Sequence, residues 1–248
     1  MRFFLLIFLS NIFQTVFAQS SELPFKDGEK FEYDIFFEFI KSGTASLVVK
    51  KDTISFSKNR LIMVGKGKTH PFFDLFFKVR DEYSTLFNTT DLVPILFNRK
   101  ISEGNFNLNQ QYLFDHQSMH VKSNSDFFPI IDSTQDMLSA LFFARTFNTN
   151  LLSNNKVLSI PVFMDNEIFR LKIKYLYNEI IKSPFGNVDC LVFQPSLQNG
   201  RVFEDEESMR IWISNDESRA LLRVEVEIWA GTIKAILKSY EKSNILCQ

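Results

Sequence analysis

Several charged side chains lie within otherwise apolar stretches of the sequence. Arg80 and Asp81 follow a run rich in phenylalanine, and Asp136 and Arg145 flank an apolar segment. A buried charge is costly unless it is paired, so these groups are expected to form structural salt bridges. The alternative is chemical: Asp81 and Asp136 could be the two carboxylates of a hydrolase, with Arg80 or Arg145 beside them. That hypothesis requires both carboxyls to meet in one cleft with raised pKa values.

The histidines offer little for metal binding or nucleophilic catalysis. His116 and His120 are four residues apart, which on a strand would place them on one face, but Asp115 to Ser118 is typical of a turn. No third ligand is placed near them in the sequence, so no metal site is predicted. His70 stands alone, and the chain has no Gly-x-Ser-x-Gly motif to present a serine nucleophile. The sequence indicates neither a catalytic residue nor a cofactor.

The two cysteines, Cys190 and Cys247, leave two interpretations open. In an oxidising compartment they could pair, and closing a loop of this length would add about 4 kcal/mol of stability. Against pairing, Cys190 lies in an apolar run, where a reduced cysteine is a common core residue. The sequence does not decide between a disulfide and a buried thiol, because it does not give the distance between the two Cα atoms.

The composition is that of a folded protein without strong charge bias. Of 248 residues, 45% are apolar and 23% are charged, and 28 Lys+Arg against 29 Asp+Glu leave a formal net charge of −1. Disordered chains lack this much apolar surface, so disorder is excluded. Nucleic-acid binding is disfavoured, since neutralising phosphates requires a clustered excess of cations.

Residues 1–18 have the layout of a secretory signal peptide. Arg2 supplies the positive end, Phe3 to Leu9 forms the apolar run, and Val16 to Ala18 precedes the expected cleavage site. Polar residues interrupt the segment, whereas a membrane anchor needs about 20 continuous apolar residues. We therefore expect an exported protein, periplasmic or secreted. Its mature part, residues 19–248, is expected to form a single β domain without a transmembrane segment.

The remaining sequence alternates between apolar and polar residues with a period of two, as half-buried strands do. The clearest strand runs from Phe31 to Phe39, after which Ser42-Gly43 is expected to turn the chain into a second strand from Ala45. Further strands are expected over residues 60–65, 78–87, 95–101, 110–114, 119–122, 157–163, 169–176, 179–182, 190–194, 209–214, 221–228 and 232–240. Many short strands without intervening helices predict an all-β, mainly antiparallel fold, as a roll, a sandwich or a curved, barrel-like sheet.

One segment in the middle of the chain has the spacing of a helix. Asp132 to Asp136 supplies candidate N-cap residues. Apolar residues and one arginine then recur at spacings of three and four: Met137, Leu138, Leu141, Phe142 and Arg145. Amphipathic helices usually cover a core, so this helix is expected to plug one end of the roll, and a lid over a cavity is the alternative.

Phenylalanine is abundant, with 29 residues in the chain, and its densest run is HPFFDLFF from His70 to Phe77. This run forms either a buried corner or an exposed apolar loop, and exposure would indicate contact with a partner or a membrane. Elsewhere we interpret the abundance as nucleotide bias, with phenylalanine filling places that leucine would also fill. The alternative is an aromatic-lined cavity for an apolar ligand.

Several motifs, in this order along the chain, resemble the DUF3108 family of exported bacterial proteins, which has no established activity. The most specific are DMLSALFFAR at 136–145 and IWISND at 211–216, which contains Trp212. Weaker matches are FKDGEKFEY at 25–33, FKVRD at 77–81, FNR at 97–99 and the glycines Gly43, Gly104, Gly186 and Gly231. The resemblance implies an all-β fold similar to the spiral β-roll of group 4 capsule lipoproteins, and an envelope location. It carries over no catalytic residue.

We therefore expect a non-catalytic envelope protein that binds an apolar or glycan-like component or a partner protein. The candidate ligand-binding residues are Arg80, Asp81, Asp136, Arg145 and Trp212. One alternative is the hydrolase described above, acting on the cell envelope. The other is an outer-membrane β protein, whose strands also alternate, although the predicted central helix speaks against it.

Overall fold

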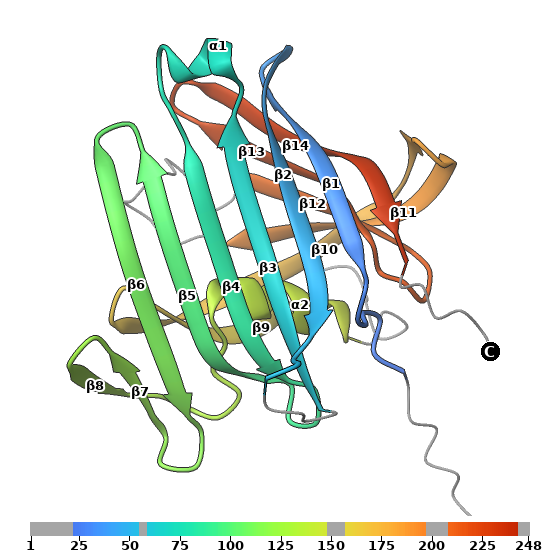
Figure 1. Cartoon of the computed structure of the whole chain (residues 1–248). Helices are drawn as coiled ribbons and strands as arrows, with labels where there is room; N and C mark the ends of the chain where they lie inside the picture. The colour runs from blue at the N-terminus through green and yellow to red at the C-terminus, as the bar shows by residue number, and fades with distance from the viewer. Residues whose placement is uncertain (1–21, 55–58, 148–156, 197–207, 243–248) are drawn as a thin grey trace, which may run out of the picture.

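The computed structural model describes residues 22–54, 59–147, 157–196 and 208–242, which form fourteen strands and two short helices (Figure 1). The first part of the chain contains β1 (Lys30–Phe37), β2 (Ile40–Lys51), β3 (Arg60–Thr69), α1 (Pro71–Asp74), β4 (Arg80–Asn88), β5 (Val93–Glu103), β6 (Phe106–Asp115), β7 (His120–Ser123) and β8 (Asp126–Pro129). After α2 (Met137–Arg145) come β9 (Val157–Met164), β10 (Glu167–Ser183), β11 (Gly186–Ser196), β12 (Met209–Ser214), β13 (Leu221–Ile228) and β14 (Gly231–Glu241). The predicted signal peptide lies outside the described residues, within which no helix is long and apolar enough to cross a membrane.

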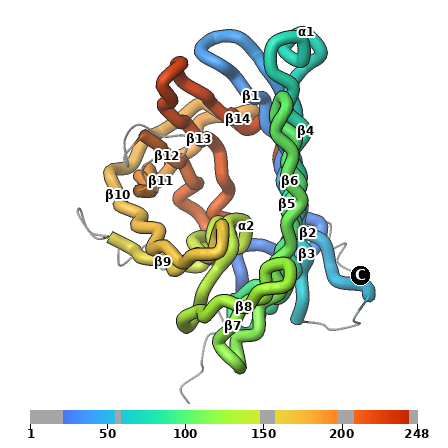
Figure 2. Tube along the Cα trace, turned by 90° about the vertical axis from the view of Figure 1, so that its left-hand side faces the viewer, coloured from blue at the N-terminus to red at the C-terminus, as the bar shows by residue number. Residues whose placement is uncertain are grey.

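These strands form one antiparallel sheet in which each strand pairs with its neighbour in the sequence, except where β1 pairs with β14. That pairing joins an N-terminal half, β1 to β8, to a C-terminal half, β9 to β14. The sheet curls so that the two halves face each other, and α2 lies between them (Figure 2). The predicted all-β, antiparallel, barrel-like fold with a mid-chain helix is confirmed.

Side chains near the β9–β10 turn connect the C-terminal half to the inner face of the N-terminal half. Arg99 on β5 pairs with Asp165 in that turn. The Asp165 backbone N–H donates to the Tyr112 hydroxyl at 3.0 Å, and the rings of Tyr112 and Phe163 lie 5.0 Å apart. The Phe163 backbone N–H also donates to the Gln135 carbonyl at 2.8 Å. Strands β9 and β10 are not neighbours of β5 and β6 in the sheet, so these contacts join two distant parts of the curled sheet.

The helix α2 separates two clusters of buried apolar side chains. Leu138 and Phe142 pack into the cluster of the N-terminal half, against Phe25. Ala140 packs into the cluster of the C-terminal half, which includes Leu191. The helix therefore packs against both halves of the roll and lies between them, rather than only across one end as the plug interpretation expected.

The predicted turn at Ser42-Gly43 is wrong, because both residues lie inside β2 and the turn falls at Glu38-Phe39. The pairing of β1 with β2 shifts register next to Ile35, opposite this segment. A Cβ atom on Gly43 would lie 2.4 Å from the carbonyl oxygen of Lys68 on β3. The glycine is needed for this close approach of two strands, which a sequence does not distinguish from a turn.

Three further elements differ from expectation. The short strand β8 and the four-residue helix α1 were not predicted, because neither is long enough to show a period. The two strands expected over 169–176 and 179–182 are one strand, β10. Its pairing with β11 skips a residue between Tyr175 and Tyr177, which is a β-bulge. The bulge reverses which face of the sheet the following side chains occupy, so in the sequence the alternation of apolar and polar residues looks interrupted.

We predict that Gly43→Ala lowers the free energy of unfolding by about 1–3 kcal/mol, because its new methyl group overlaps the backbone of β3. Gly67→Ala is the matched control, since a Cβ there meets no atom within 4 Å. The control is expected to change stability by no more than about 0.5 kcal/mol. Urea unfolding followed by circular dichroism measures both, and equal losses would contradict the packing argument.

Candidate functional site

The space between the two halves of the sheet is incompletely filled on both sides of α2. The C-side cavity, about 210 Å³, lies between α2 and strands β9 to β12. Its walls are mainly apolar side chains, including Ala140, Leu141, Ala144, Leu158, Leu191 and Ile211. The N-side cavity, about 330 Å³, lies between α2, strands β1 to β4 and strands β13 and β14. Met137, in the first turn of α2, lines both cavities.

The N-side cavity exists because small residues occupy inward-facing positions on adjacent strands. Ala45 on β2 and Gly67 on β3 are paired neighbours, and Ala235 lies on β14 beyond β1. Gly65, also on β3, adds a second position without a side chain. Larger side chains at these positions would fill the space, as Val49 does further along β2 and Met63 further along β3.

Asp136 fixes the N-terminal end of α2 and is completely buried. Its Oδ1 accepts hydrogen bonds from the backbone N–H groups of Leu138 and Ser139, both at 2.8 Å, and from the Thr85 hydroxyl at 2.9 Å. In return, the Ser139 hydroxyl accepts a hydrogen bond from the Asp136 backbone N–H at 2.9 Å, which completes a capping box. The N-cap predicted from the sequence is therefore confirmed, and the bond to Thr85 attaches the helix to β4.

Burial raises the pKa of Asp136 to about 6, although its hydrogen bonds favour the ionised form. In the part of the chain that the structure describes, Oδ2 of this carboxyl is buried without a hydrogen-bond partner. The loss of solvation at Oδ2 thus outweighs the stabilisation that the capped Oδ1 receives.

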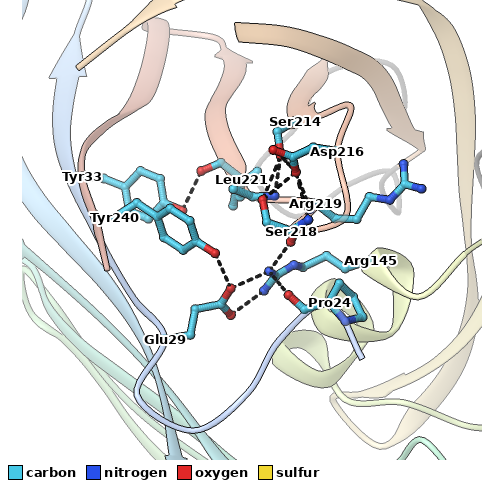
Figure 3. Close-up of polar contacts among 11 residues, drawn as sticks. Pro24, Glu29, Tyr33, Arg145, Ser214, Asp216, Ser218, Arg219, Leu221 and Tyr240 are labelled. Carbon is cyan, nitrogen blue, oxygen red and sulfur yellow. Dashed lines mark hydrogen bonds and ion pairs between the residues drawn. The ribbon is translucent and has the colours of Figure 1, made fainter. Parts of the chain in front are cut away.

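Arg145 fixes the C-terminal end of α2 through a buried ion pair (Figure 3). Its guanidinium donates to both carboxylate oxygens of Glu29, at 2.7 and 2.8 Å, and both side chains are only 2% exposed. It also donates to the backbone carbonyls of Pro24 at 3.0 Å and Ser218 at 2.7 Å. The Tyr240 hydroxyl donates to Glu29 at 3.1 Å. One guanidinium thus joins the N-terminal segment, the helix and the C-terminal half.

The carbonyl of Ser218 is held in place by the β12–β13 turn. Asp216 accepts hydrogen bonds from the hydroxyls of Ser214 and Ser218 and from the backbone N–H groups of Ser218 and Arg219. Burial alone would raise the pKa of Asp216, but these hydrogen bonds lower it overall. The carboxylate therefore organises the turn that presents Ser218 to Arg145.

The expected salt bridges form with other partners than their sequence neighbours. Arg80 pairs with Asp74 of α1, with N–O distances of 2.6 and 3.0 Å, rather than with Asp81. Asp136 and Arg145 stand at opposite ends of α2, about 13 Å apart along its axis, so they do not pair. Both arginines thus form the expected structural salt bridges, each with a carboxylate elsewhere in the chain, whereas Asp136 caps a helix and has no ion-pair partner among the described residues.

Asp81 and Asp136 do not converge in one cleft, as the hydrolase interpretation requires. Asp136 is bonded to Thr85, four residues from Asp81 on β4, which is about 13 Å along a strand. Asp81 accepts from the Ser102 backbone N–H at 3.0 Å. It lines the N-side cavity and an adjoining cavity, which also includes Arg80. The pKa of Asp136 is raised, but Asp81, the second carboxyl that the hydrolase hypothesis needs, does not lie beside it.

Trp212 and Cys190 belong to the packed interior rather than to the cavities. Trp212 is 3% exposed, its ring N–H donates to Glu179 at 2.8 Å, and Arg223 stacks on the ring at 4.7 Å. Cys190 is buried and is not bonded to another cysteine within the described residues, and burial raises the pKa of its thiol to about 12. Cys247 lies outside the described residues, so the disulfide stays a prediction.

The remaining histidines are not assembled into a metal site. His116 lies beside Phe114 and contacts the Pro94 carbonyl, whereas His120 is exposed beyond the turn. Among the described residues, no group of three histidine, cysteine or carboxylate side chains is close enough to hold a metal ion.

Residues of the site that the sequence did not predict include Glu29, Tyr240, Met137 and Arg219. Glu29 lies in the Lys26–Glu29 turn motif, and its charge before an apolar strand was the available signal. The contribution of Tyr240 depends on the pairing of β1 with β14, which no local pattern indicates.

A family model described as "Protein of unknown function (DUF3108)" matches residues 32–238. The chain belongs to the DUF3108 family. The resemblance noted in the sequence is thereby confirmed, and the matched range includes α2 and Arg145. No curated protein matches the sequence of this DUF3108 chain.

Solved structures of similar fold include the β-barrel-like DUF1849 protein from Brucella abortus, with a TM-score of 0.55 and 6% identity, covering 87% of this chain and 98% of that one. At this identity the similarity shows the fold alone. Lower similarity is found to the hypothetical protein CT021 from Chlamydia trachomatis, with a TM-score of 0.39 and 10% identity, covering 89% of each chain. The fold of this DUF3108 protein is thus similar to that of the β-barrel-like DUF1849 protein.

We predict that Arg145→Met destabilises the protein by about 3–5 kcal/mol, because it leaves the Glu29 carboxylate buried without its partner. The double variant E29L/R145M removes both charges and is expected to regain a large part of that loss. Urea denaturation of the single and double variants gives the coupling between the two sites. Additive losses in the cycle would show that the ion pair is not the origin of the effect.

The pKa of Asp136 predicts a specific pH dependence of stability. Because its folded-state pKa of about 6 exceeds the unfolded value of 3.8, its contribution is fully present below pH 3.8 and is lost as the pH rises through 6. Asp136→Asn keeps an acceptor for the helix but cannot ionise. We expect the stability of this variant relative to wild type to rise between pH 4 and pH 7, by up to about 3 kcal/mol. Parallel curves of melting temperature against pH would refute this assignment.

Proposed function

We propose that this DUF3108 protein is an exported, non-catalytic protein of the bacterial envelope that binds an apolar molecule inside the roll. The ligand is a lipid-like chain that occupies the N-side and C-side cavities beside α2. The observation that carries the proposal is the pair of largely apolar cavities on the two sides of one helix, with Met137 lining both.

The character of the walls favours an acyl chain over a glycan. A buried sugar needs hydrogen-bond partners for each hydroxyl group, since an unpaired polar group is costly in a dry site. Within the described part of the chain, the C-side cavity offers only the two arginines Arg145 and Arg219 as charged groups. The remaining cavity-facing residues of α2, such as Ala140, Leu141 and Ala144, supply no hydrogen-bond partner from their side chains. The volume of the N-side cavity, about 330 Å³, lies within the range of small-molecule sites.

A cation beside the C-side cavity favours a ligand with an anionic head. Arg219 lines this cavity, and its side chain points away from the Glu29–Arg145 network (Figure 3). Burial lowers the pKa of Arg219, and within the described residues its Nη1 is buried without a hydrogen-bond partner. A carboxylate or phosphate near this guanidinium would supply the missing partner, as charge-assisted bonds do. A fatty-acid-like amphiphile therefore fits both features.

The envelope location is supported by the sequence of residues 1–18, which has the charged, apolar and cleavage regions of a signal peptide. In such a location, acyl chains of membrane lipids are the abundant apolar molecules. The proposed ligand class and the proposed location are therefore consistent with each other.

Filling the C-side cavity tests the proposal. Ala144→Trp places an indole in the cavity, and we expect it to weaken dodecanoate binding at least tenfold in isothermal titration calorimetry. Asn109→Trp adds the same group at an exposed position of β6 and is expected to leave the affinity unchanged. Arg219→Gln is expected to weaken dodecanoate but not dodecanol, since only the former is charged. If wild type binds neither compound, the proposed function is wrong.

A further inference from the structure

The loops at one end of the strands carry a set of exposed apolar side chains, which we call the apolar rim. It consists of Phe39, Ile40, Phe72, Leu75, Phe76, Phe77, Phe106 and Trp229. Phe39 is 90% exposed, Leu75 80% and Trp229 79%. Four connections contribute: the β1–β2 turn, the α1 segment between β3 and β4, the β5–β6 turn and the β13–β14 turn. The run from His70 to Phe77 is therefore an exposed apolar loop and not a buried corner.

Hydrogen bonds connect these loops into one surface. The backbone N–H of Glu38 donates to Thr232 at 2.8 Å, which joins the β1–β2 and β13–β14 turns. His70 donates to the Ser42 carbonyl at 2.8 Å, which joins α1 to β2. Gly104 donates to the Lys78 carbonyl at 2.8 Å, which joins the β5–β6 turn to α1. Figure 1 shows α1 beside the tips of β1 and β2 at the same end of the sheet. The apolar rim is thus held as a unit.

Two of the carboxylates on these loops, those of Asp74 and Glu38, have polar partners. Asp74 is held by both terminal nitrogens of Arg80, and Glu38 accepts from the Thr232 backbone N–H at 2.6 Å. Burial raises the pKa of Glu103, with a further contribution from the carboxylate of Asp81. Lys78, by contrast, is exposed. Near the rim the exposed lysines Lys41 and Lys78 outnumber the exposed carboxylate of Glu227, which is compatible with the negative face of a bacterial membrane.

We propose that the apolar rim docks this protein onto the surface of a lipid bilayer. Phenylalanine, leucine and tryptophan side chains at loop tips enter the interfacial region readily, and tryptophan prefers that depth. The exposed side chains protrude from separate loops. A protein partner would need a separate hollow for each of them, whereas a fluid bilayer can adapt to protruding side chains in any arrangement. This inference goes beyond the proposed function and does not depend on it.

The position of the rim relative to the N-side cavity gives the docking a direction. Gly67 and its paired neighbours Ala45 and Asp81 line that cavity. Thr69, the last residue of β3, follows Gly67 by two residues, about 7 Å along the strand, and α1 begins directly afterwards. A bilayer at the rim would therefore face the end of the roll nearest to the N-side cavity, with α2 on the cavity's far side.

Vesicle flotation tests the docking, using purified protein and vesicles of phosphatidylethanolamine and phosphatidylglycerol. The rim variant F72S/F76S/W229S is expected to bind at least tenfold more weakly than wild type. The matched control I54S/F127S/I180S removes three equally exposed apolar residues from outside the rim and is expected to bind within twofold of wild type. Both variants change exposed positions, so circular dichroism should show the same fold.

Tryptophan fluorescence gives an independent measurement, because Trp229 is exposed and Trp212, the other tryptophan of the chain, is buried. Spin-labelled lipids are expected to quench Trp229 in the presence of vesicles, and Trp229→Phe should remove that signal. Equal flotation of the rim variant and wild type, or unquenched Trp229, would overturn the proposal. The proposal would also be overturned if wild type did not bind vesicles and instead formed a dimer in solution that the rim variant does not form. Dodecanoate titration without vesicles tests the interior site separately.

Discussion

The buried ion pair between Glu29 and Arg145 is the interaction on which the arrangement of the roll depends. The two residues are 116 positions apart in the sequence, and neither has appreciable access to water. Through the same guanidinium and carboxylate, the Ser218 carbonyl and the Tyr240 hydroxyl are also held. An unpaired charge in this interior is strongly unfavourable. The segments that contain Glu29, Arg145 and Ser218 must therefore pack together for the protein to fold.

This pair acts together with the cap at the other end of α2. Asp136 binds Thr85 in the N-terminal half, while Arg145 binds Ser218 in the C-terminal half. A nine-residue helix has little stability of its own, so its position is set by these end contacts and by its packing. With both ends fixed, the helix cannot slide toward either wall, and the spaces beside it persist. The cavities are thus a consequence of polar anchoring in an otherwise apolar interior.

The sequence predicted what depends on neighbours within a few residues. Alternation revealed most of the strands, and the cap at Asp136 could be read because its donors lie two and three positions away. The partner of Arg145 could not be read, since Glu29 meets it only after the sheet has curled. Gly43 was misread for the same reason: its steric constraint comes from Lys68 on another strand. Interactions between sequence neighbours could be predicted from the sequence, and contacts that form only when the sheet curls could not.

The pairing of β1 with β14 has a consequence for how the chain is made. The first and last strands meet in the middle of the sheet, while β8 and β9 form its margins. Because β14 is made after all the other strands described here, the centre of the sheet stays incomplete until residues 231–241 have been synthesised. Contacts between such distant segments also form slowly. The hairpins of each half can form as the chain is made, but the sheet that joins the two halves closes only after β14 is available.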